Sequence, residues 1–143
     1  MIRNYKLTLR SEEYNVPVLR TFIMGVLHDV NCSQNKIREI KSVASELFLN
    51  TIHHAYLMRA DNLCLDVNIE IELMKNKLKL TVEDFGVGIE DIEKAKEPMF
   101  TTKGNESRAG IGFTIVEGFT ESYKIISNHN FGTKVIAVIN LAE

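Results

Sequence analysis

The sequence predicts an α+β fold in which helices cover one face of an antiparallel or mixed, mostly antiparallel, sheet. Three observations indicate it. Apolar residues make up 45% of the 143 residues, enough for one domain with a real core. Helical periodicity dominates the first part of the chain, whereas strict alternation of apolar and polar residues, typical of strands, is concentrated in the later part. We therefore expect a single two-layer domain over residues 1–143.

The first part of the chain predicts one strand and two helices. Residues 5–10 alternate between apolar and polar side chains, as in a half-buried strand. Pro17 suits the first turn of a helix, and a break at residues 31–33 ends that helix and caps the next. Residues 36–58 are expected to form one long helix. Its apolar stripe comprises Ile37, Ile40, Ala44, Leu47 and Phe48.

The second part of the chain predicts four strands and two further helices. Residues 63–72 alternate strictly, and a turn near Asn76 leads into a strand at residues 78–83. We expect a short polar helix at residues 89–97, a loop at 98–109 and a helix at 110–121. Two last strands, at residues 123–127 and 134–140, flank a turn at residues 130–132.

Composition excludes several classes of protein. The net charge of −2 gives no electrostatic case for binding nucleic acid or an anionic membrane. No run approaches the roughly 18 apolar residues of a membrane span, and no apolar signal-peptide core is visible. Cys32 and Cys64 fit neither a zinc nor a redox motif, so we expect buried, reduced thiols and a cytoplasmic protein.

Glu46 and Asn50 are four residues apart in the predicted long helix, so they share one side of it. They could form a local hydrogen bond on a solvated face. Alternatively, the Asn50 oxygen binds magnesium, which prefers oxygen ligands, and Glu46 lies where an attacking hydroxyl arrives. His54 continues the same line by one turn and could touch a nucleotide; neither it nor His53 belongs to a metal-binding motif.

Asp84 has the same parity as the apolar residues of its strand, which directs its carboxylate toward the core. It could form a turn before Gly86. It could instead accept a hydrogen bond from the adenine amino group; guanine presents a carbonyl there, so Asp84 favours ATP over GTP. Gly86 and Gly88 would let the backbone approach a flat ligand closely.

Gly110 and Gly112 open a predicted helix, whose free amides and dipole favour phosphate. A plain helix start explains the same pattern, and the motif is neither a P-loop nor a dinucleotide fingerprint. Hydroxyls and cations just before this helix could close over a polyphosphate, or simply be solvated. They are Thr101, Thr102, Lys103 and Arg108.

Several segments together resemble a known family. Residues 45–56, SELFLNTIHHAY, resemble the N-box of the ATPase fold shared by gyrase, the ninety-kilodalton heat-shock chaperone, histidine kinases and MutL, and residues 84–89 resemble its first glycine box. Residues 97–103, EPMFTTK, followed by residues 110–119, are similar to the lid and second glycine box of the sporulation anti-sigma F factors, which are serine kinases. The resemblance covers nearly the whole chain.

This resemblance implies a Bergerat-type, histidine-kinase-like ATPase fold that binds ATP and Mg²⁺. It implies a homodimer that binds a sporulation sigma factor and phosphorylates a serine of an antagonist (anti-anti-sigma) protein. By position, Glu46 would be the general base, Asn50 the magnesium ligand and Asp84 the adenine reader, with Arg20 facing sigma. Arg108 would contact the phosphates and stabilise the charge on the transferred phosphoryl group. Others shaping the nucleotide site would be Gly86, Gly88, Thr101, Thr102, Lys103, Gly110, Gly112 and Thr133.

Three other interpretations stay open. The chain could be a general-stress type of anti-sigma kinase. It could be a module that binds sigma in response to ATP without catalytic turnover. It could also be a plain structural domain in which the motifs are coincidental. The intact Glu46 favours the kinase over the non-catalytic module.

Overall fold

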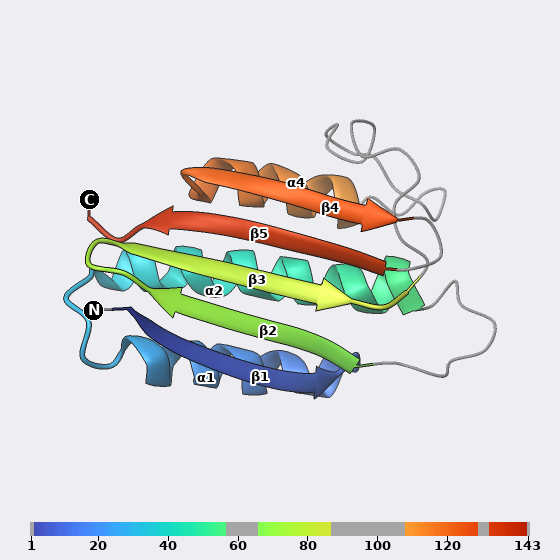
Figure 1. Cartoon of the computed structure of the whole chain (residues 1–143), viewed down its shortest axis with the longest axis horizontal. Coiled ribbons are helices and arrows are strands. Elements are labelled where there is room, and N and C mark those ends of the chain that lie inside the picture. Colours follow the sequence, from blue (N-terminus) through green and yellow to red (C-terminus); the bar gives the residue numbers. More distant parts are fainter. Residues whose placement is uncertain (1, 57–65, 87–107, 129–131, 143) are drawn as a thin grey trace.

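A computed structural model describes residues 2–56, 66–86, 108–128 and 132–142 of the chain. Its core is a five-stranded sheet with the strand order β1-β2-β3-β5-β4, and every pair of neighbours is antiparallel. Helices α1, α2 and α4 all lie on one face of this sheet (Figure 1). The strands are β1 (Arg3–Arg10), β2 (Asp66–Leu73), β3 (Lys77–Asp84), β4 (Ser122–Asn128) and β5 (Gly132–Asn140). The predicted fold class is thus confirmed.

The helical layer follows the predicted periodicity. Helix α1 (Val16–Leu27) has proline in its first turn, and α2 (Gln34–Asn50) begins after Ser33, whose hydroxyl accepts a 3.0 Å hydrogen bond from the Lys36 N–H. Helix α4 (Arg108–Phe119) packs against α2. A short 3-10 turn, η1 (Glu13–Asn15), precedes α1, and a π-helical segment, η2 (Thr51–Tyr56), extends α2.

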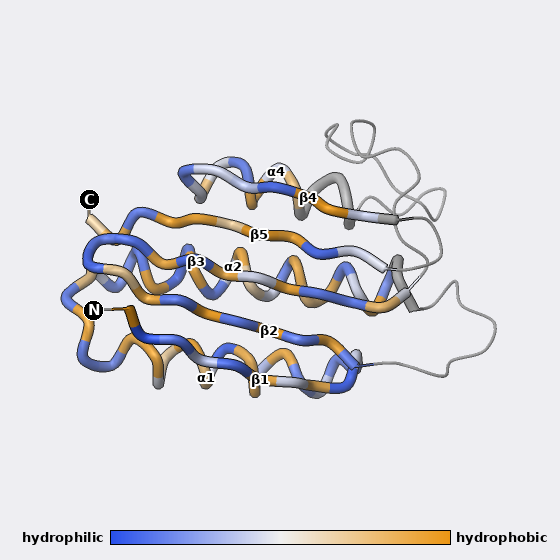
Figure 2. Tube along the Cα trace, in the orientation of Figure 1, coloured by the Kyte–Doolittle hydropathy of each residue, from blue (hydrophilic) through white to orange (hydrophobic). Residues whose placement is uncertain are grey.

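The core forms where the apolar face of the sheet meets the helices. Strands β2 and β3 bury alternate side chains, and Figure 2 shows the same alternation of hydrophobic and hydrophilic residues along their traces. All five residues of the predicted stripe of α2 are buried, and Phe48 is fully so. Burial of this apolar surface is the main force that holds helices and sheet together.

Several element boundaries differ from those predicted. The long helix begins at Gln34 instead of residue 36, and its α-helical geometry ends at Asn50 instead of residue 58. Strand β2 begins at Asp66 among the described residues, and α4 begins at Arg108, two residues earlier than predicted. Arg108 therefore belongs to the helix and not to the preceding loop. The helix predicted at 89–97, the loop at 98–107 and Cys64 lie outside the described residues; Cys32 is half-buried rather than buried.

The pairing of the strands shows which residues lie at each end of the sheet. At one end Arg3 faces Leu73 and Asn140 faces Lys77, and both ends of the chain lie there (Figure 1). At the other end Asp84, the last residue of β3, faces Thr133 at the start of β5. The end of α2 and the beginning of α4 lie at this second end as well (Figure 1). Of the residues predicted to bind a nucleotide, Asn50, Asp84 and Thr133 therefore lie at this same end of the sheet.

Candidate functional site

Strands β3 and β5 come unusually close where β3 ends. Gly132 has a φ of +113°, a backbone conformation that other residues rarely adopt. A Cβ atom at this position would overlap the carbonyl oxygen of Asp84 and lie 2.9 Å from the Cα of Phe85. Only glycine therefore fits here, and it brings the start of β5 against the end of β3.

The Asp84 carboxylate is held in this narrow junction. Its residue is 8% exposed, and its Oδ1 accepts a 3.0 Å hydrogen bond from the Gly86 N–H. Burial raises the pKa of Asp84 to about 6, since a charged carboxylate loses hydration there. Hydrogen bonds from the backbone of Gly86 and Thr133 lower this pKa, and the neighbouring charge of Glu83 raises it. The inward direction predicted from strand parity is confirmed, and so is the turn-type hydrogen bond to residue 86.

Thr133, at the start of β5, links this end of the sheet to the edge strand β4. Its Oγ1 lies 2.9 Å from the Oγ of Ser127 in β4, and the Ser127 hydroxyl also donates to the Gly132 carbonyl at 3.2 Å. Thr133 is buried beside Asp84, its partner across β3 and β5. These contacts fix the start of β5.

The end of α2 carries a buried amide that lacks partners. Neither Nδ2 nor Oδ1 of Asn50 has a hydrogen-bond partner among the described residues, although both atoms are shielded from solvent. Leaving a buried polar group unsatisfied costs about 1–3 kcal/mol. Glu46, one turn earlier, also has a buried carboxylate oxygen, Oε2. An amide kept at such a cost suits a ligand, because the ligand would supply the missing partner.

This donor set fits a magnesium ion bound together with phosphate. The Asn50 oxygen is a ligand of the type that Mg²⁺ prefers, and Mg²⁺ usually takes only one or two protein ligands, with phosphate and water completing its shell. Across the described ranges, no group of three or more His, Cys, Asp or Glu side chains could hold a metal by itself. A magnesium site here would thus depend on the nucleotide.

The other predicted nucleotide residues are placed only in part. Gly110 and Gly112 lie in the first turns of α4, and the backbone of His54 lies in the π-helical segment η2. Segments of π-helix often occur at functional sites. The side chains of His54 and Arg108 are not among those described. Gly88, Thr101, Thr102 and Lys103 lie outside the described residues.

Arg20 does not stand free on the surface of α1. Its Nη1 donates a 2.9 Å hydrogen bond to the Ser45 hydroxyl of α2, the residue directly before Glu46. Sequence reasoning missed this contact, together with a buried pair between Ser11 and Thr51. Both join residues far apart in the chain, and none of the three hydroxyls belongs to a pattern that would have revealed its partner.

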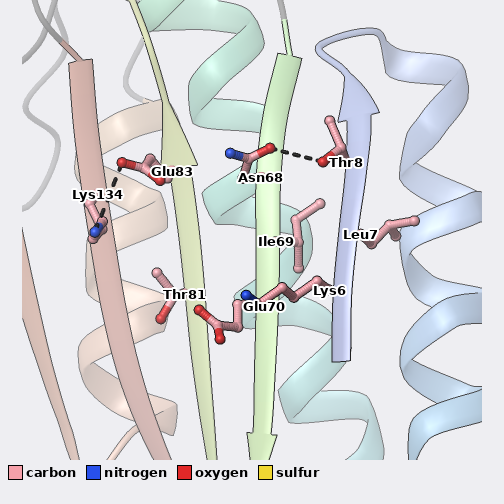
Figure 3. A pocket seen from close by; sticks show the side chains of 9 residues that line it. All are labelled: Lys6, Leu7, Thr8, Asn68, Ile69, Glu70, Thr81, Glu83 and Lys134. Atoms are coloured by element: carbon pink, nitrogen blue, oxygen red, sulfur yellow. Dashed lines mark hydrogen bonds and ion pairs between the residues drawn. The ribbon is translucent and has the colours of Figure 1, made fainter. Parts of the chain in front are cut away.

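The open face of the sheet has a shallow hollow of about 280 Å³, away from the helices. Its polar side chains pair within the sheet: Thr8 donates to Asn68 at 2.9 Å, and Lys134 lies 3.9 Å from Glu83 (Figure 3). Opposite charges alternate, so the hollow offers no concentrated field for a polyphosphate. It is lined by Lys6, Leu7, Thr8, Asn68, Ile69, Glu70, Thr81, Glu83 and Lys134.

Fold and site together define a class of protein. The family model of the histidine kinase-like ATPase domain matches residues 9–139, which include the ends of α2 and β3 and the start of β5. No helix within the described ranges has both the length and the apolar character needed to cross a membrane.

Curated relatives narrow this class. Anti-sigma F factors from Bacillus cereus and Bacillus thuringiensis are 36% identical to this chain over 121 residues, which cover 85% of this chain and 81% of each relative. The chain therefore belongs to the anti-sigma F factor family of histidine kinase-like ATPase domains.

Solved structures agree with the fold. In the SiaB–SiaC complex from Pseudomonas aeruginosa, a chain matches with a TM-score of 0.71 at 13% identity, covering 94% of this chain and 88% of that one. A Mycobacterium tuberculosis protein with RsbU and RsbW domains matches with a TM-score of 0.69 at 14% identity, covering 99% of this chain and 33% of that one. At these identities the likeness shows the shared fold.

Proposed function

We propose that residues 1–143 form one ATP-binding domain that inhibits a sigma factor and phosphorylates a serine of an antagonist protein. The observation that carries this proposal is the buried amide of Asn50, which has no hydrogen-bond partner among the described residues and lies at the same end of the sheet as the buried carboxylate of Asp84. Membership in the anti-sigma F factor family supplies the kind of partner.

In this proposal Asp84 recognises adenine. Its Oδ1 is bound to the Gly86 N–H, and the carboxylate can still accept from an exocyclic amino group. Guanine would bring a carbonyl oxygen to the same place, and two opposed acceptors discriminate strongly. Gly86, Gly88 and Thr133 complete the wall against which the base lies.

In this proposal the end of α2 lies beside the phosphates of ATP and the serine hydroxyl that accepts the phosphoryl group. Asn50 would hold Mg²⁺ through its amide oxygen, and a magnesium ion there would offset phosphate charge. Glu46, one turn away on the same side, takes the proton of the serine hydroxyl as general base. Because phosphoryl transfer depends mainly on position and charge, a rigid helix suits both roles.

The start of α4 serves the phosphate groups in this proposal. The first turn of a helix offers free backbone N–H groups and a positive dipole end, and Gly110 and Gly112 would let phosphate approach them. Arg108, the first residue of α4, steadies the charge on the transferred group. The remaining groups proposed to contact nucleotide are His54, Thr101, Thr102 and Lys103.

The partners follow from the family and are proposals for this chain. Its relatives are named for anti-sigma F activity, so we assign a sporulation sigma factor as the inhibited protein and an anti-anti-sigma protein as the substrate. Arg20 of α1 would contact sigma. We further propose a homodimer, as the family resemblance implies, and a cytoplasmic location, because sigma factors act on RNA polymerase in that compartment.

A phosphate-transfer assay tests the kinase. Purified protein, labelled ATP and a purified anti-anti-sigma protein should give a labelled antagonist, and Glu46→Gln should slow the transfer about 100-fold or more while ATP still binds. Glu39→Gln is the matched control, since Glu39 lies on the same helix in an ion pair with Lys36. Full transfer by Glu46→Gln would remove Glu46 from its role. A wild-type protein that binds ATP and sigma without transfer would be a non-catalytic module.

A further inference from the structure

Three side-chain contacts tie the segment before and within α1 to the second half of α2 and to its π-helical extension η2. The hydroxyls of Ser11 and Thr51 lie 2.8 Å apart and are buried. Glu13 Oε1 lies 3.7 Å from His53 Nε2. Further along, Arg20 Nη1 donates to Ser45 Oγ at 2.9 Å. Residues 11–20 therefore contact α2 and its π-helical extension at several points.

These contacts bracket the two residues proposed to act on the reactants. Ser45 directly precedes Glu46, and Thr51 directly follows Asn50. Thr51 is also anchored to its own helix, because its hydroxyl donates to the Phe48 carbonyl at 2.7 Å. Each end of the short stretch from 46 to 50 is thus held against the N-terminal part of the chain.

The contact at Ser45 differs from the other two in its chemistry. Ser45 is 7% exposed, and its hydroxyl accepts from a guanidinium group that is itself half-buried. Hydrogen bonds from a charged donor are shorter and stronger than neutral ones, and they fix direction as well as distance. This bond therefore resists rotation of α2 about its axis at the position next to Glu46.

We propose that Arg20 is a positioning residue for Glu46, acting through Ser45. The inference rests on the proposed kinase function. The guanidinium group of Arg20 is planar and rigid, so its hydrogen bond to Ser45 restricts the position of that residue. A displacement of about 1 Å at a reacting group can lower a rate about 100-fold.

Removal of the Ser45 hydroxyl tests this without touching Arg20. At saturating ATP and antagonist, Ser45→Ala should lower kcat about tenfold and leave the Kd for ATP unchanged. Ser45→Thr, which keeps a hydroxyl, should restore most of the rate. Ser33→Ala is the matched control, because it removes the capping hydroxyl at the other end of the same helix. It should lower the thermal stability and leave kcat unchanged.

A double-mutant cycle separates coupling from simple loss of stability. Arg20→Met should lower kcat to the same degree as Ser45→Ala, and the double variant should fall no further, because one contact is lost in each case. Multiplicative loss in the double variant overturns the proposal, as does a wild-type kcat in Ser45→Ala or an equal loss in Ser33→Ala. A wild-type protein that transfers no phosphate would instead refute the kinase function, and this inference with it.

Discussion

Acidification should weaken ATP binding, because Asp84 Oδ1 already accepts from the Gly86 N–H, and a proton on Oδ2 would turn the remaining oxygen into a donor that faces the adenine amino group. Burial raises the pKa of Asp84 from 3.8 to about 6 in the free protein, with smaller opposing contributions from the Gly86 and Thr133 backbone. An adenine amino group would stabilise the ionised form and lower this pKa. At about pH 5 only about a tenth of the free carboxyl is ionised, so we expect affinity about tenfold lower than at pH 7.5.

The stability of the ligand-free protein should depend on pH in the opposite direction to ATP binding. Because its folded pKa lies above that in the unfolded chain, Asp84 binds its proton more tightly when the protein is folded. The free energy of unfolding should therefore fall as pH rises from about 4 to about 6, by about 3 kcal/mol if Asp84 acted alone. This carboxylate thus destabilises the ligand-free protein most in the pH range where ATP binds best.

Isothermal titration calorimetry across about pH 5 to 7.5 measures the effect. Asp84→Asn is the control: it lacks the titrating group but shares the titration of the ATP phosphates, so its affinity should change much less. The amide introduced by this substitution can also donate to guanine, and the preference for ATP over GTP should shrink. Equal pH dependence in the wild type and Asp84→Asn, with both folded by circular dichroism, would refute this role for Asp84.

Three further predictions concern stability and ligand binding. Gly132→Ala should lower the free energy of unfolding by about 3 kcal/mol or more in urea titration, because φ is positive there and the added Cβ would overlap the Asp84 carbonyl oxygen. Gly25→Ala is the control and should not lower it, because a Cβ at that position has nothing within 4 Å. Asn50→Leu should raise that free energy by about 1 kcal/mol, because it removes a buried amide that has no partner within the described part of the chain, yet it should abolish magnesium-dependent ATP binding in dialysis. Phe48→Ala should destabilise by about 3–5 kcal/mol in the same titration, because the ring is fully buried.

The sequence predicts those features that depend on the periodicity of apolar residues within one strand or helix. Alternation in β2 and β3 identifies which side chains are buried, and it extends to Asp84, whose burial follows from its place in the pattern. The five residues predicted for the apolar stripe of α2 are all buried for the same reason, and the structure adds Val43, which the prediction did not include. Glu46 and Asn50 fall on one side of that helix through the 3.6-residue repeat, so the candidate site is partly readable from spacing alone.

Other features depend on contacts between distant residues. The α-helical geometry of α2 stops at Asn50 where Thr51 bonds both to the Phe48 carbonyl and to Ser11, a residue of another segment. The start of α4 at Arg108 precedes the glycines that suggested a helix start. The bond between Arg20 and Ser45 joins two helices. No periodicity in one segment can predict such pairings, because they arise only after the layers pack.

The separation of the two ends of the sheet has a practical consequence. Asp84 and Thr133 lie at one end, whereas Arg3 and Asn140 lie at the other, as Figure 1 shows. A purification tag, fluorophore or biosensor linker attached at either terminus therefore points away from the proposed nucleotide pocket. Immobilised protein should keep that pocket open to solution, and the binding measurements above can be made on a surface as well as in free solution.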